Sequence, residues 1–121
     1  MDILIKIIIA IVAALHLYFL YFEMFAWETT GRKVFKSLPK EIFKPTKSMA
    51  ANQGLYNGFL AAGLIWTFFI TNQEWYSNIA IFFLGCVAVA GIYAALTVSK
   101  KIFFIQAGPA LIGIILLLIA N

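Results

Sequence analysis

Four long runs of apolar residues dominate the chain, and polar segments separate them. The runs cover about 3–27, 49–71, 75–98 and 102–120. Each is close to the ~20 residues that an α-helix needs to cross the ~30 Å hydrocarbon core of a bilayer. Because a helix satisfies its own backbone hydrogen bonds within lipid, the pattern predicts four transmembrane helices.

The polar connectors are one long segment, 29–48, and two very short ones. Short connectors leave consecutive helices antiparallel and adjacent. We therefore expect an all-α fold, a single transmembrane domain over residues 1–121 built as an up-and-down bundle of four helices. The first run is longer than the 7–15-residue apolar core of a secretory signal, and we interpret it as a retained helix.

Composition supports this assignment to the membrane. Of the 121 residues, 64% are hydrophobic and only 12% are charged, and the mean hydropathy is +0.97. Soluble domains contain roughly 45–50% apolar residues. A soluble fold of this length cannot bury so much apolar surface, so we expect the bilayer to act as its solvent.

The basic residues are distributed unevenly along the chain. Six of the nine lie in segment 29–48 and two, Lys100 and Lys101, lie in the last connector, whereas Lys6 is near the N-terminus. In a four-span protein, eight of the nine would therefore face the same side. Since basic loops stay in the cytoplasm, we expect a multi-pass protein of the plasma (inner) membrane with loops one and three cytoplasmic and both termini outside.

The basic segment 29–48 also contains apolar residues and is interrupted by Pro39 and Pro45. Two interpretations stay open: a solvated loop that sets the topology, or short interfacial turns that attract anionic lipid headgroups. Membrane lipid is the expected partner in both. The segment is only weakly basic and the chain has no recognisable nucleic-acid fold, so we expect no nucleic-acid partner. The six cations are Arg32, Lys33, Lys36, Lys40, Lys44 and Lys47.

Polar side chains inside the apolar runs carry the candidate chemistry, because placing them in hydrocarbon is expensive. His16 and Glu23 are seven residues apart, which places them on nearly one face of a helix about 10 Å apart, and Trp27 continues this stripe. The second run carries Asn52, Gln53, Tyr56 and Asn57, whose positions on a helical wheel span about 140° and predict a single polar face. The third and fourth runs add Tyr93 and Gln106.

The depth of these residues in the bilayer predicts that they meet. A rise of ~1.5 Å per residue places polar groups from all four helices in the cytoplasmic half. We therefore expect a cavity open to the cytoplasmic side, with His16 and Glu23 as acid and base. A structural alternative for Glu23 is an ion pair with a cation of the first loop, and the amides would otherwise join helices by hydrogen bonds worth roughly 0.6 kcal/mol each. The expected ligand-binding residues are Trp27, Asn52, Gln53, Tyr56, Asn57, Tyr93 and Gln106.

Two further features concern helix geometry. Gly54 and Gly58 form a GxxxG pair that permits close helix packing, and the same face would serve a homo-oligomer. Pro109 removes the N–H that would bond the carbonyl of Ile105, so we expect a kink in the last helix.

The sequence contains no cofactor signature. His16 and the single cysteine, Cys86, cannot form a zinc site, and a lone histidine is a weak indication of haem. The chain lacks a phosphate-binding glycine loop and a nucleophile elbow. We therefore expect neither a metal nor a cofactor.

Three features together resemble one known family: the run Asn-Gln-Gly-Leu-Tyr-Asn-Gly at 52–58, the stripe from His16 to Trp27, and Gln-Ala-Gly-Pro-Ala at 106–110. It is a bacterial family of small four-helix membrane proteins, catalogued as a domain of unknown function (number 1304). The likeness covers essentially the whole chain and implies the same architecture. Some members carry the label epimerase, although no sugar-nucleotide or dinucleotide motif accompanies it here.

Three functions follow from these observations. The first is a membrane protein that binds a small amphipathic or lipid-derived molecule in the polar cavity, with proton-transfer isomerisation by His16 and Glu23 as its enzymatic form. The second is a small proton-coupled exporter that relies on Glu23; the charge bias and the position of Glu23 near a helix end weigh against it. The third is a structural or accessory membrane subunit, which the pair of Gly54 and Gly58 favours.

Overall fold

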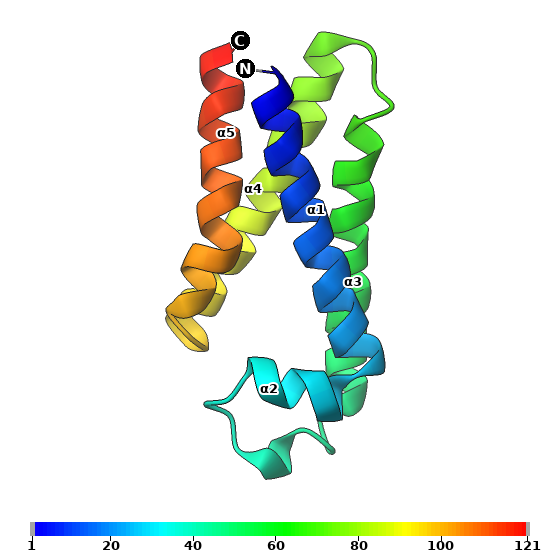
Figure 1. Ribbon diagram of the computed structural model, residues 1–121, viewed down its shortest axis with the longest axis vertical. Helices are drawn as coiled ribbons and strands as arrows, with labels where there is room; N and C mark the ends of the chain where they lie inside the picture. The colour runs from blue at the N-terminus through cyan, green and yellow to red at the C-terminus, as the bar shows by residue number, and fades with distance from the viewer. Residues whose placement is uncertain (1, 121) are drawn as a thin grey trace. The chain divides into compact units, whose positions relative to one another are not determined.

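The computed structural model describes residues 2–120 and shows an all-α protein (Figure 1). Its main helices are α1 (Asp2–Phe25), α3 (Lys47–Thr67), α4 (Gln73–Thr97) and α5 (Gly108–Ala120). The described chain contains no strand. The predicted all-α class is therefore confirmed.

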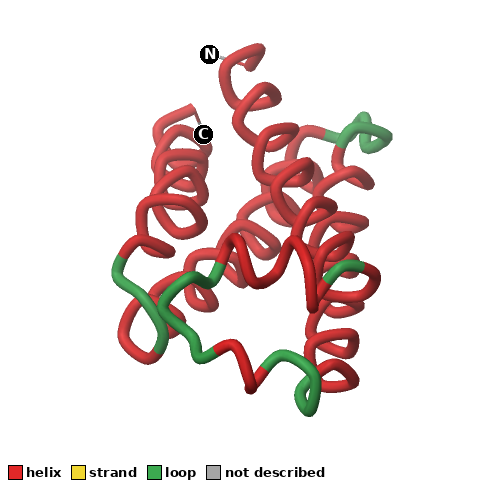
Figure 2. The backbone as a smooth tube through the Cα atoms, turned by 60° about the horizontal axis from the view of Figure 1, so that its bottom comes forward, coloured by secondary structure: helices red, strands yellow, loops and turns green. Residues whose placement is uncertain are grey.

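The basic segment between α1 and α3 folds as a series of short turns (Figure 2). It begins with a π-helical turn, η1 (Trp27–Gly31), which continues into α2 (Arg32–Val34). A 3₁₀ turn, η2 (Lys40–Ile42), follows Pro39, whose φ of −60° suits the entry to a helix. Short helical turns thus make up part of the segment, and its position in solvent or at the lipid surface stays a prediction.

The ends of two helices differ from the sequence prediction. Helix α1 ends at Phe25, because Ala26 leaves helical geometry with φ −143° and ψ 33°. Trp27 therefore lies outside α1 and does not continue its stripe. The last apolar run begins with a π-helical turn, η3 (Phe103–Ala107), whose N-terminal end precedes α5 by five residues. The π turn ends two residues before Pro109, and the kink expected from this proline stays a prediction.

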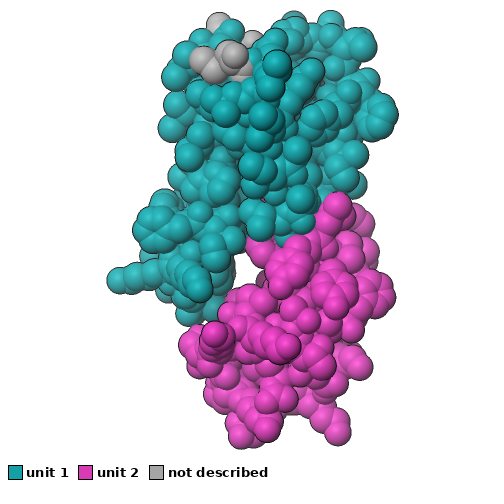
Figure 3. All heavy atoms as spheres, viewed as in Figure 1, with its two compact units in different colours: residues 1–15, 60–121 teal, residues 16–59 magenta. Residues whose placement is uncertain are grey.

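The chain divides into two compact units (Figure 3). Unit 1 contains residues 1–15 and 60–121, and unit 2 contains residues 16–59. Helices α1 and α3 contribute residues to both units.

Unit 1 contains the main hydrophobic core. Helix α4 packs against α5 and η3, and small residues permit this packing. A Cβ atom at Gly91 would lie only 2.7 Å from the backbone nitrogen of Ala107, so α4 and η3 are in direct backbone contact there. The buried core residues are Ile5, Ile9, Val12, Ala13, Leu64, Tyr76, Ala80, Leu84, Val87, Ala88, Ala110 and Leu117.

Successive helices of unit 1 run in opposite directions. The first turn of α1, the connector 68–72 and the last turn of α5 lie at one end of the unit, whereas residues 98–102 lie at the other (Figures 1 and 2). Asn72 caps α4 by accepting a 3.0 Å hydrogen bond from the backbone N–H of Trp75. The antiparallel arrangement of α4 and α5 follows from their short connector.

Three helical stretches are long and apolar enough to cross a membrane: Asp2–Phe25, Gln73–Thr97 and Phe103–Ala120. They indicate a membrane protein. Helix α3 is not among them, because amides such as Asn52, Gln53 and Asn57 make it less apolar than the others. A count of four spans therefore stays a prediction.

Candidate functional site

A hydrogen bond joins two polar side chains of α1 and α3 in unit 2. The amide Nδ2 of Asn57 donates to Oε1 of Glu23 over 2.5 Å. Glu23 is only 4% exposed, and Asn57 is half-buried. A buried acidic side chain is rare in proteins and needs such a partner, so this pair is the principal candidate site.

Glycine residues of α3 make this contact possible. A Cβ atom at Gly54 would lie 2.8 Å from Cγ of Met24 and 3.0 Å from Cβ of Glu23. At Gly58 it would lie 2.6 Å from Cδ1 of Leu20. The GxxxG pair thus lets α3 approach α1 closely enough for Asn57 to reach the carboxylate. Homo-oligomerisation through this face stays a prediction, and within the chain the two glycines already contact α1.

The polar face predicted on α3 divides into two parts. Asn57 is about 60° from Gly54 on the helical wheel, whereas Asn52 and Tyr56 are about 160° from it and Gln53 about 100°. Since Gly54 faces α1, only Asn57 reaches Glu23. The other three side chains are exposed, Tyr56 by 65%, and Asn52 donates to the carbonyl of Ser48 in its own helix over 3.1 Å.

His16 is fully buried on the same side of α1 as Glu23. Its ring meets the ring of Phe19 edge-on, with centroids 5.1 Å apart and planes at 67°. The seven-residue spacing puts His16 about 10 Å from Glu23 along the axis, well beyond hydrogen-bond reach. A proton could pass between them only through an intervening ligand or water.

Trp27 forms the centre of an aromatic cluster in the basic segment. Its indole Nε1 donates to Oγ1 of Thr46 over 3.0 Å. The ring lies 4.9 Å from that of Phe43 and 5.7 Å from that of Phe35, and a Cβ atom at Gly31 would lie 2.7 Å from it. These partners could not be predicted from the chain, because Phe35, Phe43 and Thr46 lie 8 to 19 residues from Trp27 and share no periodic pattern with it. The indole N–H already has a partner within the chain.

The two remaining predicted residues, Tyr93 and Gln106, belong to unit 1. Tyr93 lies on α4 and its side chain is exposed. Gln106 lies in η3 and is buried. The candidate site therefore consists of the contact between Glu23 and Asn57, which lies within unit 2.

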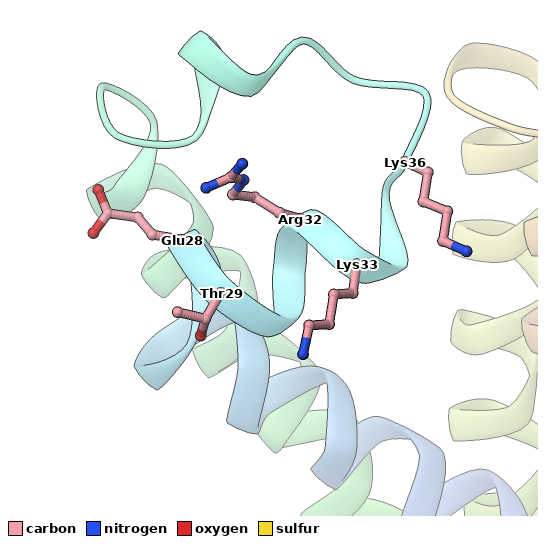
Figure 4. A pocket seen from close by; sticks show the side chains of 5 residues that line it. All are labelled: Glu28, Thr29, Arg32, Lys33 and Lys36. Carbon is pink, nitrogen blue, oxygen red and sulfur yellow. The ribbon is translucent and has the colours of Figure 1, made fainter.

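A separate open pocket of about 540 Å³ lies on the basic segment (Figure 4). None of the predicted site residues lines it. Four polar or charged side chains of η1 and α2 contribute, and the following loop adds one more. The lining residues are Glu28, Thr29, Arg32, Lys33 and Lys36.

The described residues contain no group of three or more His, Cys, Asp and Glu side chains that could hold a metal ion. Among the acidic residues that the structure describes, Glu23 is the one that is buried, and Asn57 is its hydrogen-bond partner. Its chemistry is that of a hydrogen-bond acceptor and, when protonated, of an acid.

Comparisons with known proteins extend over nearly the whole chain. The family model described as "Protein of unknown function (DUF1304)" matches residues 10–118. The uncharacterized protein YpaA of Lactococcus lactis subsp. lactis (strain IL1403) is 32% identical over 117 residues, which are 95% of this chain and 97% of YpaA. No solved structure matches the chain significantly. These similarities identify a family without an assigned activity.

Proposed function

We propose that this chain, which belongs to the DUF1304 family of proteins of unknown function, is a membrane protein that binds a small amphipathic or lipid-derived molecule at Glu23 and Asn57. The observation that carries the proposal is the buried hydrogen bond from Asn57 Nδ2 to Glu23 Oε1. Polar side chains within membrane-spanning helices are expensive, and those that persist commonly mark a substrate or ion site.

The chemistry of the pair supports a ligand with a polar end. A carboxylate has two oxygens and about four lone-pair positions, so the single donor from Asn57 does not saturate it. The amide oxygen of Asn57 can accept a further bond from a hydroxyl or amine. A ligand that carries hydroxyl or amine donors beside an apolar chain would match this pair and the lipid around it.

The proposal includes a four-span topology. Helix α3 has 21 residues, which at ~1.5 Å each extend about 31 Å, close to the ~30 Å hydrocarbon core. The first turn of α1 and the last turn of α5 lie at the same end of unit 1 (Figure 1), and this arrangement suits an even number of membrane crossings. We place loops one and three in the cytoplasm and both termini outside, because eight of the nine basic residues lie in these loops.

The enzymatic form of the proposal is a proton-transfer isomerisation by Glu23 and His16. Their ~10 Å separation requires that the ligand lie between them, with one group removing a proton and the other returning it. We propose that the exposed amide of Gln53, which lies one helical turn before Asn57 on nearly the same face of α3, contacts a part of the ligand outside the buried pair. Asn52 faces away from α1 and is not part of the proposed site.

Native mass spectrometry of the protein purified from its membrane tests the binding function. We expect a co-purified small molecule on the wild type and at least a several-fold lower occupancy in Glu23→Gln and in Asn57→Leu. Glu74→Gln and Asn78→Leu are matched controls, since they make the same chemical changes at exposed positions of α4. Equal occupancy in all five proteins would contradict the proposal.

A proton-coupled exporter is the second candidate, and the buried carboxylate of Glu23 in the first helix favours it. Proton flux into liposomes that contain the purified protein separates the two functions. An exporter conducts protons in the wild type and not in Glu23→Gln, whereas a binding protein shows no flux in either.

A further inference from the structure

The pocket on the basic segment differs from the buried pair of Glu23 and Asn57 in its exposure and in its charge. It is open, and its lining carries three cations against one carboxylate, that of Glu28. Arg32, Lys33 and Lys36 are all exposed. In Figure 4 their side chains extend separately from α2 and the loop after it, with nitrogen at the free end of each.

The base of this pocket is held in place by the aromatic cluster around Trp27. The hydrogen bond from Trp27 to Thr46 fixes η1 to the residue that precedes α3 by one position. Phe43 is fully covered and lies against the Trp27 ring. Because η1 continues directly into α2, Arg32 and Lys33 project from a braced backbone and lose less freedom on binding than cations of a flexible loop would.

Apolar side chains are also exposed within the basic segment and at the end of α1. Val34 on α2 is 43% exposed and Ile42 at the end of η2 is 38% exposed. Phe25, at the end of α1, is exposed as well. Cations together with exposed apolar side chains, next to a helix apolar enough to span the membrane, are typical of a segment at the bilayer surface.

We propose that the pocket lined by Glu28, Thr29, Arg32, Lys33 and Lys36 binds the phosphate of an anionic phospholipid headgroup. The planar guanidinium of Arg32 can pair with two phosphate oxygens, and the two lysines contribute point charges. The carboxylate of Glu28 repels the phosphate but accepts hydrogen bonds from headgroup hydroxyls. This site is separate from the Glu23–Asn57 pair and does not depend on the ligand proposed there.

Titration of the detergent-purified protein with short-chain phosphatidylglycerol, followed by native mass spectrometry, tests the proposal. The double variant Lys33→Gln with Lys36→Gln is expected to bind roughly tenfold more weakly, since each cation near an anionic lipid surface contributes up to ~1 kcal/mol. Glu28→Gln is expected to bind more tightly than the wild type, because it removes the one repulsive charge of the pocket.

The matched control is the double variant of Lys40 and Lys44 to Gln, which removes the same charge from the same segment outside the pocket. General attraction of the segment to anionic lipid would weaken both double variants equally, and that result would overturn the proposal. Short-chain phosphatidylcholine is expected to bind at least tenfold more weakly than phosphatidylglycerol. Displacement of the lipid by equimolar inorganic phosphate would also overturn it, by assigning the pocket to free phosphate.

Discussion

Replacement of Gly91 by alanine is expected to separate two packed segments of unit 1. The added Cβ atom would lie 2.7 Å from the nitrogen of Ala107, 2.9 Å from its Cβ and 3.1 Å from its Cα. Favourable contacts between carbon atoms lie at about 3.5–4.0 Å. Two of the three atoms belong to the backbone of η3, so no side-chain rotation relieves the clash.

The size of the effect follows from two opposing terms. Alanine stabilises a helix interior by roughly 0.5–1 kcal/mol relative to glycine. Forcing an extra group into a packed core costs typically 1–3 kcal/mol. Gly85 provides the reference, because it lies in the same helix and a Cβ atom there would meet nothing within 4 Å. The difference in unfolding free energy between Gly85→Ala and Gly91→Ala should therefore be about 1–3 kcal/mol.

Unfolding by sodium dodecyl sulfate in mixed micelles, followed by far-UV circular dichroism, measures this difference. Gly85→Ala is expected to be as stable as the wild type or slightly more stable, and Gly91→Ala less stable. Equal stability of the two variants would refute the inferred backbone contact between α4 and η3.

Three further predictions concern other contacts. In a double-mutant cycle of Glu23→Leu and Asn57→Leu, the coupling in unfolding free energy should be about 0.6–1.7 kcal/mol, and additive effects would mean that the pair does not interact. Trp27→Phe keeps the ring contacts but loses the hydrogen bond to Thr46. Loss of that bond, worth ~1 kcal/mol, should let trypsin cut the basic segment roughly fivefold faster. An unchanged cleavage rate would contradict the bracing role of Trp27. Pro109→Ala restores a backbone N–H, which should favour α-helical over π-helical bonding and slow amide exchange across η3; unaltered exchange would show that packing, and not proline, sets the π turn.

Much of the fold could be predicted from the apolar runs alone. The start of α1 and both ends of α4 lie within about two residues of their predicted positions, because turn-forming and charged residues such as Asn72 and Lys100 interrupt the apolar pattern there. The end of α1 and the π turn η3 could not be placed in this way. Both depend on backbone hydrogen bonds, and the apolar pattern continues through them.

The candidate site was only partly accessible to sequence reasoning. The spacing of His16 and Glu23 placed them on one side of a helix, and both are buried. The helical wheel grouped Asn57 with Asn52 on one polar face, but it carries no information about which direction faces a neighbour. The contact of Gly54 with α1 sets this direction and brings Asn57 to Glu23.

The sequence by itself determined the class of this protein, since long apolar runs are stable only as helices in lipid and the basic residues gather in two connectors. The tertiary structure alone decided which polar groups meet. Rotation of α3 about its axis depends on its closest packing against α1, and the form of the basic segment depends on the aromatic contacts of Trp27. Both are contacts between residues distant in the chain, which local periodicity does not encode.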